Sequence, residues 1–166
     1  LLAAHISAPL TDAAAINQRL DMVQHFFDDD NLRGNLGEAL RQVPDIERAL
    51  SRLTLARGGP RDLAAIRDGL ARTADIREIL DGAQLPVGID NALDDFGAHG
   101  ELVLKLTEAL EVELPLYARD GGFIAEGYAP AFDELRGLRD ESRRLIAGLQ
   151  ENYVKAAGVQ NLKIKH

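Results

Sequence analysis

The feature that most constrains this chain is a long stretch, from about Pro130 to Ala157, in which apolar side chains recur at helical spacing. The spacing approximates a heptad row formed by Leu135, Leu138, Ser142, Leu145 and Leu149. At roughly 1.5 Å per residue such a helix measures about 42 Å, which is longer than a compact domain of this size needs. We therefore expect the helix to protrude or to pair with something outside this chain.

The residues before this stretch also show helical periodicity, interrupted by turns. An apolar stripe on one face predicts a helix from about Asp12 to Phe27, capped by Thr11 or Asp12. Further stripes predict helices around Leu36–Val43, Ile46–Leu53, Leu63–Leu70, Ala74–Leu80, Ile89–Phe96 and Leu102–Leu110. The expected fold class is all-α, an irregular multi-helix bundle with one long protruding helix.

Two segments depart from this helical pattern. Between Leu114 and Tyr128, apolar residues flank Asp120-Gly121-Gly122, which predicts a short extended excursion around a glycine turn. From Val159 to Ile164 apolar and polar residues alternate, which predicts a short C-terminal strand whose partner this chain does not obviously supply. Because the chain also starts without a methionine, we expect it to be a segment of a longer protein.

Composition and charge limit the classes of function. The chain is 46% hydrophobic and 28% charged, as in globular proteins, and its net charge of -8 disfavours free-standing binding to a phosphate backbone. It has no cysteine for a disulfide or a thiolate metal site. A basic signal sequence and a long membrane-spanning apolar window are both missing from the sequence, so we expect a cytoplasmic protein without membrane contact.

An EF-hand calcium loop is one candidate metal site. Asp29, Asn31, Arg33 and Gly34 match its first, third, fifth and sixth positions in spacing. The fifth position is nevertheless a cation, and the twelfth is Leu40 where a bidentate glutamate is needed. A solvated turn between two helices is the favoured interpretation.

Two glycine-rich turns are candidate phosphate sites. Arg57-Gly58-Gly59-Pro60-Arg61-Asp62 combines glycines, a helix start and two arginines, but it lacks the spacing of a phosphate-binding loop. Asp120-Gly121-Gly122 is too short to be specific. We interpret the first as a helix-initiating turn and the second as a tight turn.

Histidines and paired acidic residues offer no convergent catalytic set. His5, His25, His99 and His166 lie far apart and form no i, i+4 pair. The acidic clusters at residues 94–95 and 28–30 resemble solvated faces of an acidic chain. Arginines cluster on the long helix, where we expect intrahelical ion pairs such as Asp140 with Arg144 to blunt the patch; the cluster is Arg136, Arg139, Arg143 and Arg144.

His5–Asp12 and Ile16–Val23 form the pattern of an apolar pair, Pro-Leu and Asp, followed by Ile-x-x-Arg-Leu-Asp-x-Val. In this pattern the chain resembles the MutS family of DNA mismatch repair proteins. Asp45–Leu53 and Pro60–Leu63 resemble the family's DLERLLSRL and PRDL motifs. Further matches follow in the family's order at residues 120–124, 127–128, 132–135 and 161–164, so the resemblance covers nearly the whole chain.

The resemblance implies the core and lever region of such a protein, its domain III. Residues 1–128 would form a helical core domain, residues 129–158 a long lever helix leading to the DNA-gripping clamp, and residues 159–166 the start of the clamp's first strand. Partners would be the other domains of the same polypeptide. Through the intact protein they would include mismatched duplex DNA, MutL and a second copy in a homodimer.

The family's chemical motifs lie in other domains. Neither the mismatch-reading Phe-x-Glu nor the Walker-type ATPase motif occurs in these 166 residues. We therefore expect no catalytic, cofactor-binding or metal site residue in this chain, which would not be an enzyme itself, whereas ATP and magnesium would belong to the intact protein. The arginine and aspartate of residues 19–21 and 60–63 are assigned to helix capping and ion pairs between helices.

The implied function is mechanical. The chain would connect the clamp and the mismatch-recognition domain to the ATPase domain and transmit conformational change between them. Alternatives are an independent helical protein-interaction module, the equivalent segment of a MutS relative acting in recombination, and an all-helical enzyme using the acidic clusters at residues 94–95 or 28–30.

Overall fold

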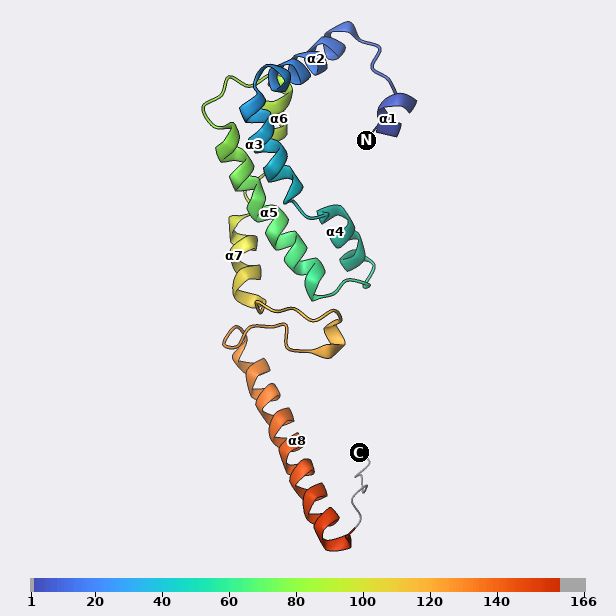
Figure 1. The fold of residues 1–166 in the computed structure, drawn as a ribbon, viewed down its shortest axis with the longest axis vertical. Coiled ribbons are helices and arrows are strands. Elements are labelled where there is room, and N and C mark those ends of the chain that lie inside the picture. The colour runs from blue at the N-terminus through green and yellow to red at the C-terminus, as the bar shows by residue number, and fades with distance from the viewer. Residues whose placement is uncertain (1, 159–166) are drawn as a thin grey trace. The chain divides into compact units, whose positions relative to one another are not determined.

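The computed structural model describes residues 2–158 and contains two compact units, Leu1–Phe123 and Ile124–His166 (Figure 1). The first unit contains α1 (Leu2–Ser7), α2 (Ala13–Asp28), α3 (Asp30–Arg41), α4 (Ile46–Thr54), α5 (Pro60–Leu80), α6 (Val87–Asp94), α7 (Gly100–Ala109) and the 3-10 turn η1 (Ala118–Asp120). The second contains α8 (Pro130–Ala157). Residues 2–158 form no β-strand, which confirms the all-α prediction; the strand predicted at 159–164 lies outside the described residues.

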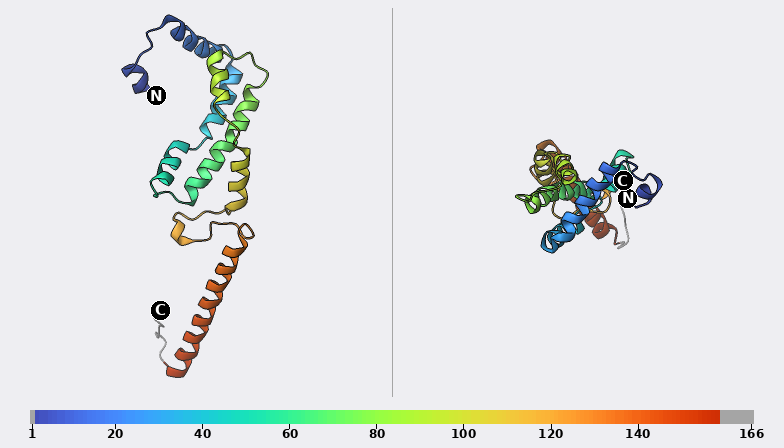
Figure 2. Two further views of the ribbon diagram at one scale, coloured as in Figure 1. Left: turned by 180° about the vertical axis from the view of Figure 1, so that it is seen from behind. Right: turned by 90° about the horizontal axis from the view of Figure 1, so that it is seen from above.

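Helix α5 is the centre of the first unit. It packs against α3, α4 and α7, while α2 contacts α3 and α6 (Figures 1 and 2). The buried apolar side chains come from this arrangement and are Ala49 of α4, Ile76 and Leu80 of α5, Ala109 at the end of α7, and Leu110. Pro60, the first residue of α5, is fully buried. The described core is therefore small, and its side chains come from α5, from α4 and from the end of α7, both of which pack on α5.

The starts of α2, α3 and α4 are fixed by aspartate caps. The carboxylate of Asp12 accepts a hydrogen bond from the amide of Ala15 at 2.8 Å, and that of Asp29 accepts one from Leu32 at 2.9 Å. Each carboxylate satisfies a backbone donor that the first turn of a helix leaves without an intrahelical partner. These contacts confirm Asp12 as the cap of α2 and show that Asp29 caps α3.

One helix boundary was predicted wrongly. We expected a helix ending near Leu70 and a separate helical turn over residues 74–80, but α5 runs without a break from Pro60 to Leu80. Its buried residues Gly69, Ile76 and Leu80 lie seven and four positions apart, so they share one face along the helix. Burial of that continuous face outweighs the low helix propensity of the interior glycine.

Glycine at position 69 is required by close packing. An added Cβ there would overlap with Cγ1 and Cδ1 of Ile46 and would lie 3.5 Å from Cγ of Pro44. The start of α4 can therefore approach the middle of α5 only because position 69 carries no side chain.

The segment between α7 and α8 contains a tight turn at its glycines. Residues 118–120 form the 3-10 turn η1, and Gly121 follows with a φ of 69°. The amide of Glu111 donates to the carbonyl of Phe123 at 3.0 Å, which brings together the two ends of this loop within the first unit. The tight turn is confirmed, whereas the extended flanks form no strand within residues 2–158.

Candidate interaction surfaces

Helix α8 has the bounds that its periodicity predicts. Pro130 occupies its first turn, where a missing amide hydrogen costs nothing, and Gly158 ends it in the left-handed conformation with a φ of 68°. Its 28 residues give a length of about 42 Å at roughly 1.5 Å per residue. Gly137 and Gly148 are its interior glycines, and an added Cβ at either would meet nothing within 4 Å.

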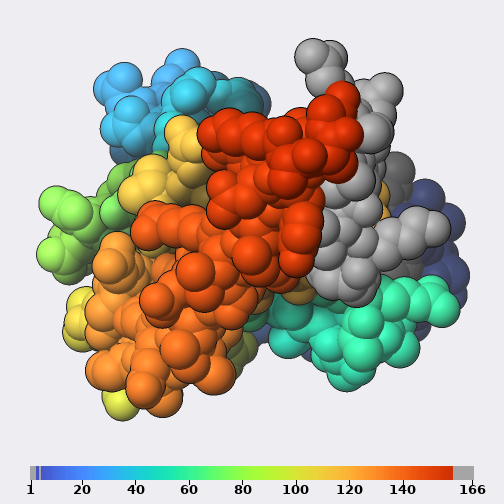
Figure 3. All heavy atoms as spheres, turned by 90° about the horizontal axis from the view of Figure 1, so that it is seen from below, coloured from blue at the N-terminus to red at the C-terminus, as the bar shows by residue number. Residues whose placement is uncertain are grey.

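The leucine row of α8 is exposed. The exposed fractions of Leu135, Leu138, Leu145 and Leu149, which we call the α8 seam, are 64%, 56%, 64% and 51%. Figure 3 shows the helix surface in space-filling form, orange to red. Four leucines in one row form an apolar surface of the kind that marks a protein interaction site.

A second exposed apolar row lies on α2. Ile16, Leu20, Val23 and Phe27, which we call the α2 stripe, have exposed fractions of 39%, 58%, 63% and 71%. The sequence predicted this row as one helix face, and that placement is confirmed. Contacts of α2 with α3 and α6 leave the row open to solvent, so a face with the pattern of a core face is uncovered in the described residues.

Ion pairs partly neutralise the positive charge of the arginine cluster on α8. Arg139 donates from Nε to Asp140 at 2.9 Å, and this hydrogen bond lowers the pKa of the aspartate carboxyl and raises that of the arginine. The expected partner of Asp140 was Arg144; the structure pairs Asp140 with its chain neighbour instead. Near the end of the helix, Lys155 hydrogen-bonds Glu151 and lowers its pKa.

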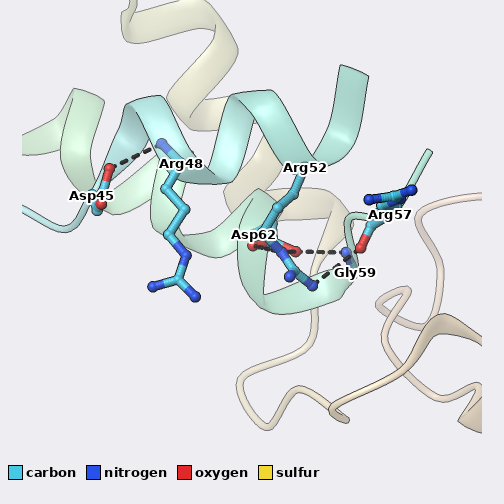
Figure 4. Close-up of polar contacts among 6 residues, drawn as sticks. All are labelled: Asp45, Arg48, Arg52, Arg57, Gly59 and Asp62. Atoms are coloured by element: carbon cyan, nitrogen blue, oxygen red, sulfur yellow. Dashed lines mark hydrogen bonds and ion pairs between the residues drawn. The ribbon is translucent and has the colours of Figure 1, made fainter. Parts of the chain in front are cut away.

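The glycine-rich turn before α5 is a capped helix start (Figure 4). The amide of Gly59 donates to Oδ2 of Asp62 at 2.8 Å, and Nε of Arg52 lies 3.1 Å and 3.2 Å from the two oxygens of the same carboxylate. Arg52 also donates to the carbonyl of Arg57 at 3.1 Å. One carboxylate thus caps α5 and pairs with α4, which confirms the capping and inter-helix roles expected of Asp62.

The other arginine of this turn acts differently. Arg61 donates from Nε to the carbonyl of Leu114 at 3.2 Å, so it ties the start of α5 to the loop after α7. Because the Gly59 amide is already committed to Asp62, the turn does not aim a row of free amides at one point, as a phosphate cradle would require. The helix-initiating interpretation of residues 57–62 is confirmed.

The calcium-loop residues are not arranged as a loop. Asp29 caps α3, and Asn31 and Arg33 already lie inside that helix. Arg33 pairs with Asp30 and donates to the carbonyl of Phe26 at 2.8 Å, so a cation occupies the place where a calcium ligand would be needed. The interhelical turn between α2 and α3 is confirmed.

The remaining candidate residues stay apart. Asp94 ends α6 and Asp95 caps it, while His5, His25 and His99 belong to three different helix regions. His166 lies outside the described residues. Within residues 2–158, no group of three or more histidine and acidic side chains is placed to hold a metal ion. Over the same residues, no helix combines the length and apolar character needed to cross a bilayer.

Within the described residues, the chain is an all-α protein with two exposed apolar helix faces, the α8 seam and the α2 stripe. The family model of MutS domain III matches residues 1–162, and the chain therefore belongs to the MutS family as its domain III. It is 49% identical over 167 residues to the DNA mismatch repair protein MutS of Rhizobium meliloti, and 48% and 50% identical over 166 residues to the proteins of that name from Roseobacter denitrificans and Paracoccus denitrificans. All of this chain is covered, but only 18%, 19% and 19% of those relatives. The chain thus spans less than a fifth of their length.

Proposed function

We propose that this domain III is a mechanical connector in a MutS mismatch repair protein. It would join the DNA-binding clamp and the mismatch-recognition domain to the ATPase domain and pass conformational change between them. In this arrangement residues 1–128 are the core, residues 129–158 are the lever, and residues 159–166 begin the clamp. The observation that carries the proposal is α8, a helix of 28 residues without an interior proline whose leucine row is exposed.

A lever has to be stiff, and the sequence of α8 gives it that property. Each residue of a helix is held by a hydrogen bond to the next turn, and the propensity cost within α8 is concentrated at Gly137 and Gly148. The α8 seam supplies the second requirement, because pairing with another helix along such a row would resist bending. Family membership makes the other domains of the same polypeptide the natural source of that helix.

The intact protein provides the chemistry in this proposal. ATP with magnesium would bind the ATPase domain, mismatched duplex DNA would be held by the recognition domain and clamp, and MutL and a second copy in a homodimer would bind the whole assembly. The role proposed for this chain is transmission of conformational change, without a catalytic group of its own.

The test compares a softened and a stiffened lever in the intact protein. Replacing Leu138 and Arg139 by Gly-Gly costs roughly 1 kcal/mol per residue in helix propensity, while Gly137→Ala with Gly148→Ala gains about the same for each site. The measurement is release of a mismatched duplex as a function of ATP concentration, at equal folded fraction. We expect the softened variant to bind mismatches and hydrolyse ATP but to couple the two poorly, and the stiffened variant to retain coupling.

An unchanged nucleotide dependence in the softened variant would show that α8 is only a scaffold. A matched control is Ala147→Gly with Gly148→Ala, which moves one glycine along the helix and leaves the number of glycines and the α8 seam unchanged. This control should couple as the unaltered protein does.

The second candidate function is an independent helical interaction module. The exposed α8 seam and α2 stripe are the observations that favour it, because both would suit an external helical partner. A MutS relative acting in recombination would use the segment in the same mechanical way. Replacing the leucines of the α8 seam separates the two classes: an interaction module would lose partner binding, with no dependence on nucleotide.

A further inference from the structure

The start of α8 has no hydrogen bond from a capping side chain. Its N-cap residue is Ala129, whose side chain has no oxygen to accept a hydrogen bond from the first turn. Helices α2, α3 and α4, by contrast, begin with aspartates that accept such bonds. A helix proposed as a lever nevertheless needs one end whose position and direction are fixed.

Two side chains from the first turns of α8 reach back to the preceding backbone instead. Asp133 accepts a hydrogen bond from the amide of Gly127 at 2.8 Å, and Arg136 donates to the carbonyl of Ile124 at 2.8 Å. Both side chains are mostly buried, with 23% of each exposed. The contacts span six and twelve positions in the chain, so they hold residues 124–127 against the helix rather than stabilise the helix internally.

The two side chains also act on each other. Nη1 of Arg136 lies 3.8 Å from Oδ1 of Asp133, an oxygen that is buried and has no hydrogen-bond partner within the described residues. The guanidinium of Arg136 also lies over the ring of Phe132, 5.1 Å from its centre. Charge attraction and the aromatic face thus hold the arginine in the orientation that reaches Ile124.

The backbone that receives these contacts is itself shaped for them. The amide of Tyr128 donates to the carbonyl of Ala125 at 3.3 Å, which closes a turn whose Gly127 has a φ of 85°. The amide of this glycine is the donor to the carboxylate of Asp133. We call the set formed by Asp133, Arg136 and the backbone of residues 124–127 the clasp.

We propose that Asp133 and Arg136 are positioning residues, which through the clasp fix where α8 starts and the direction in which it leaves residues 124–129. The proposal rests on the proposed function in one respect, since it supplies the lever with its anchored end. The clasp itself is a property of residues 124–136 and can be tested without the other domains.

The first measurement is hydrogen exchange at the Gly127 amide in this 166-residue chain. Asp133→Ala removes its acceptor, and a hydrogen bond to a charged group is strong enough that we expect exchange about tenfold faster or more. Asp133→Asn keeps an acceptor oxygen and should hold exchange within a few-fold of the unaltered chain. Equal exchange in the alanine variant and the unaltered chain would show that Asp133 does not hold this backbone.

The second measurement reports the direction of α8 relative to the preceding residues 124–129, not the stability of the helix. The chain has no cysteine, so spin labels can be placed uniquely at Glu126→Cys, an exposed position in the backbone segment of the clasp, and at Glu141→Cys, an exposed position further along α8. Arg136→Met should broaden or shift the distance distribution between the labels. Arg136→Lys keeps the charge but lacks the planar fork, so it should recover only part of the narrow distribution. Arg139→Met, which removes the same charge outside the clasp, should leave it unchanged.

Loss of stability alone is separated from loss of direction by a compensated variant. Adding Gly137→Ala and Gly148→Ala restores helix stability without touching the clasp. If the distance distribution of the Arg136→Met variant stays broad in this background, the proposal is supported. If the distribution returns to its original width, Arg136 only stabilises the helix and does not set its direction. If the clasp variants change the distances while ATP-dependent release of DNA by the intact protein is unaffected, the clasp stands and the lever function fails.

Discussion

The close approach of α4 to α5 makes a sharp prediction for Gly69→Ala. An alanine normally favours a helix interior over glycine by about 1 kcal/mol, so the substitution would stabilise an open site. At position 69 the new methyl group overlaps with two side-chain carbons of Ile46. One of these, Cγ1, lies next to the branched Cβ and cannot move away without a change of χ1, which is stiff in a β-branched residue.

The gain in helix propensity and the cost of overpacking against Ile46 have opposite effects on stability, and we expect the cost of overpacking to be larger. Forcing an extra carbon into a filled contact costs typically about 1–3 kcal/mol. After the gain in helix propensity is subtracted, we expect the free energy of unfolding to fall by roughly 0–2 kcal/mol. Ile46→Val removes Cδ1 but keeps Cγ1, so in the Gly69→Ala background it should recover only part of the loss.

Denaturant unfolding followed by circular dichroism measures this difference, and Gly34→Ala in α3 is the matched control. An added Cβ at position 34 meets nothing within 4 Å, so this variant should be more stable by about 1 kcal/mol. A Gly69→Ala variant as stable as the control would refute the argument, because it would mean that α4 does not approach α5 at this glycine.

Three further predictions concern helix starts, helix interiors and pH. Asp62→Ala removes both a cap and an ion pair, so the free energy of unfolding should fall by about 1–3 kcal/mol in denaturant titrations, and by less for Asp62→Asn. Gly137→Ala and Gly148→Ala should each slow amide exchange in α8 about fivefold, the equivalent of roughly 1 kcal/mol; an unchanged rate would show that the glycines do not limit helix stability. Because the hydrogen bond from Arg139 lowers the pKa of Asp140, its stabilising effect is present above the ordinary pKa of an aspartate and is lost as pH falls through the lowered value. Acid titration of helix content should therefore show a smaller loss in Asp140→Asn than in the unaltered chain.

The elements that the sequence predicted well are those set by local chemistry. The bounds of α8 followed from its periodicity with Pro130 at the start, and the start of α2 followed from Asp12. The predictions failed where contacts between residues far apart in the sequence determine the structure. The apolar stripes predicted two helical segments where the structure has the single helix α5, and at Gly69 in its interior the approach of α4 requires a glycine. Helix α1 has only six residues, and its periodicity is too short to be recognised.

The polar contacts were less predictable than the helices. Helical spacing suggested Arg144 as a partner for Asp140, but several arginines lie within reach of that carboxylate, and the neighbouring Arg139 binds it. The clasp at the start of α8 had one signal in the sequence, the absence of a capping side chain at position 129. Its contacts reach back six and twelve positions, a separation that no helical pattern reveals.

The exposed faces show what periodicity predicts and what it leaves open. An apolar row such as the α2 stripe is typical of a helix face that is buried against another part of a protein. Hydrophobic spacing therefore identifies which face is buried, but it does not identify what packs on that face. In the described residues the α2 stripe and the α8 seam both remain exposed, whereas α5, with the same kind of pattern, is covered by α3, α4 and α7. Full burial of a leucine contributes about 1.5–3 kcal/mol, so two rows of four side chains represent a large stabilisation that is available only on association. Relatives about five times as long as this chain contain ample sequence to provide that association. We therefore expect leucine-to-serine changes in the α8 seam to alter this isolated chain little and to weaken the assembled family protein, and equal effects in both would contradict this explanation.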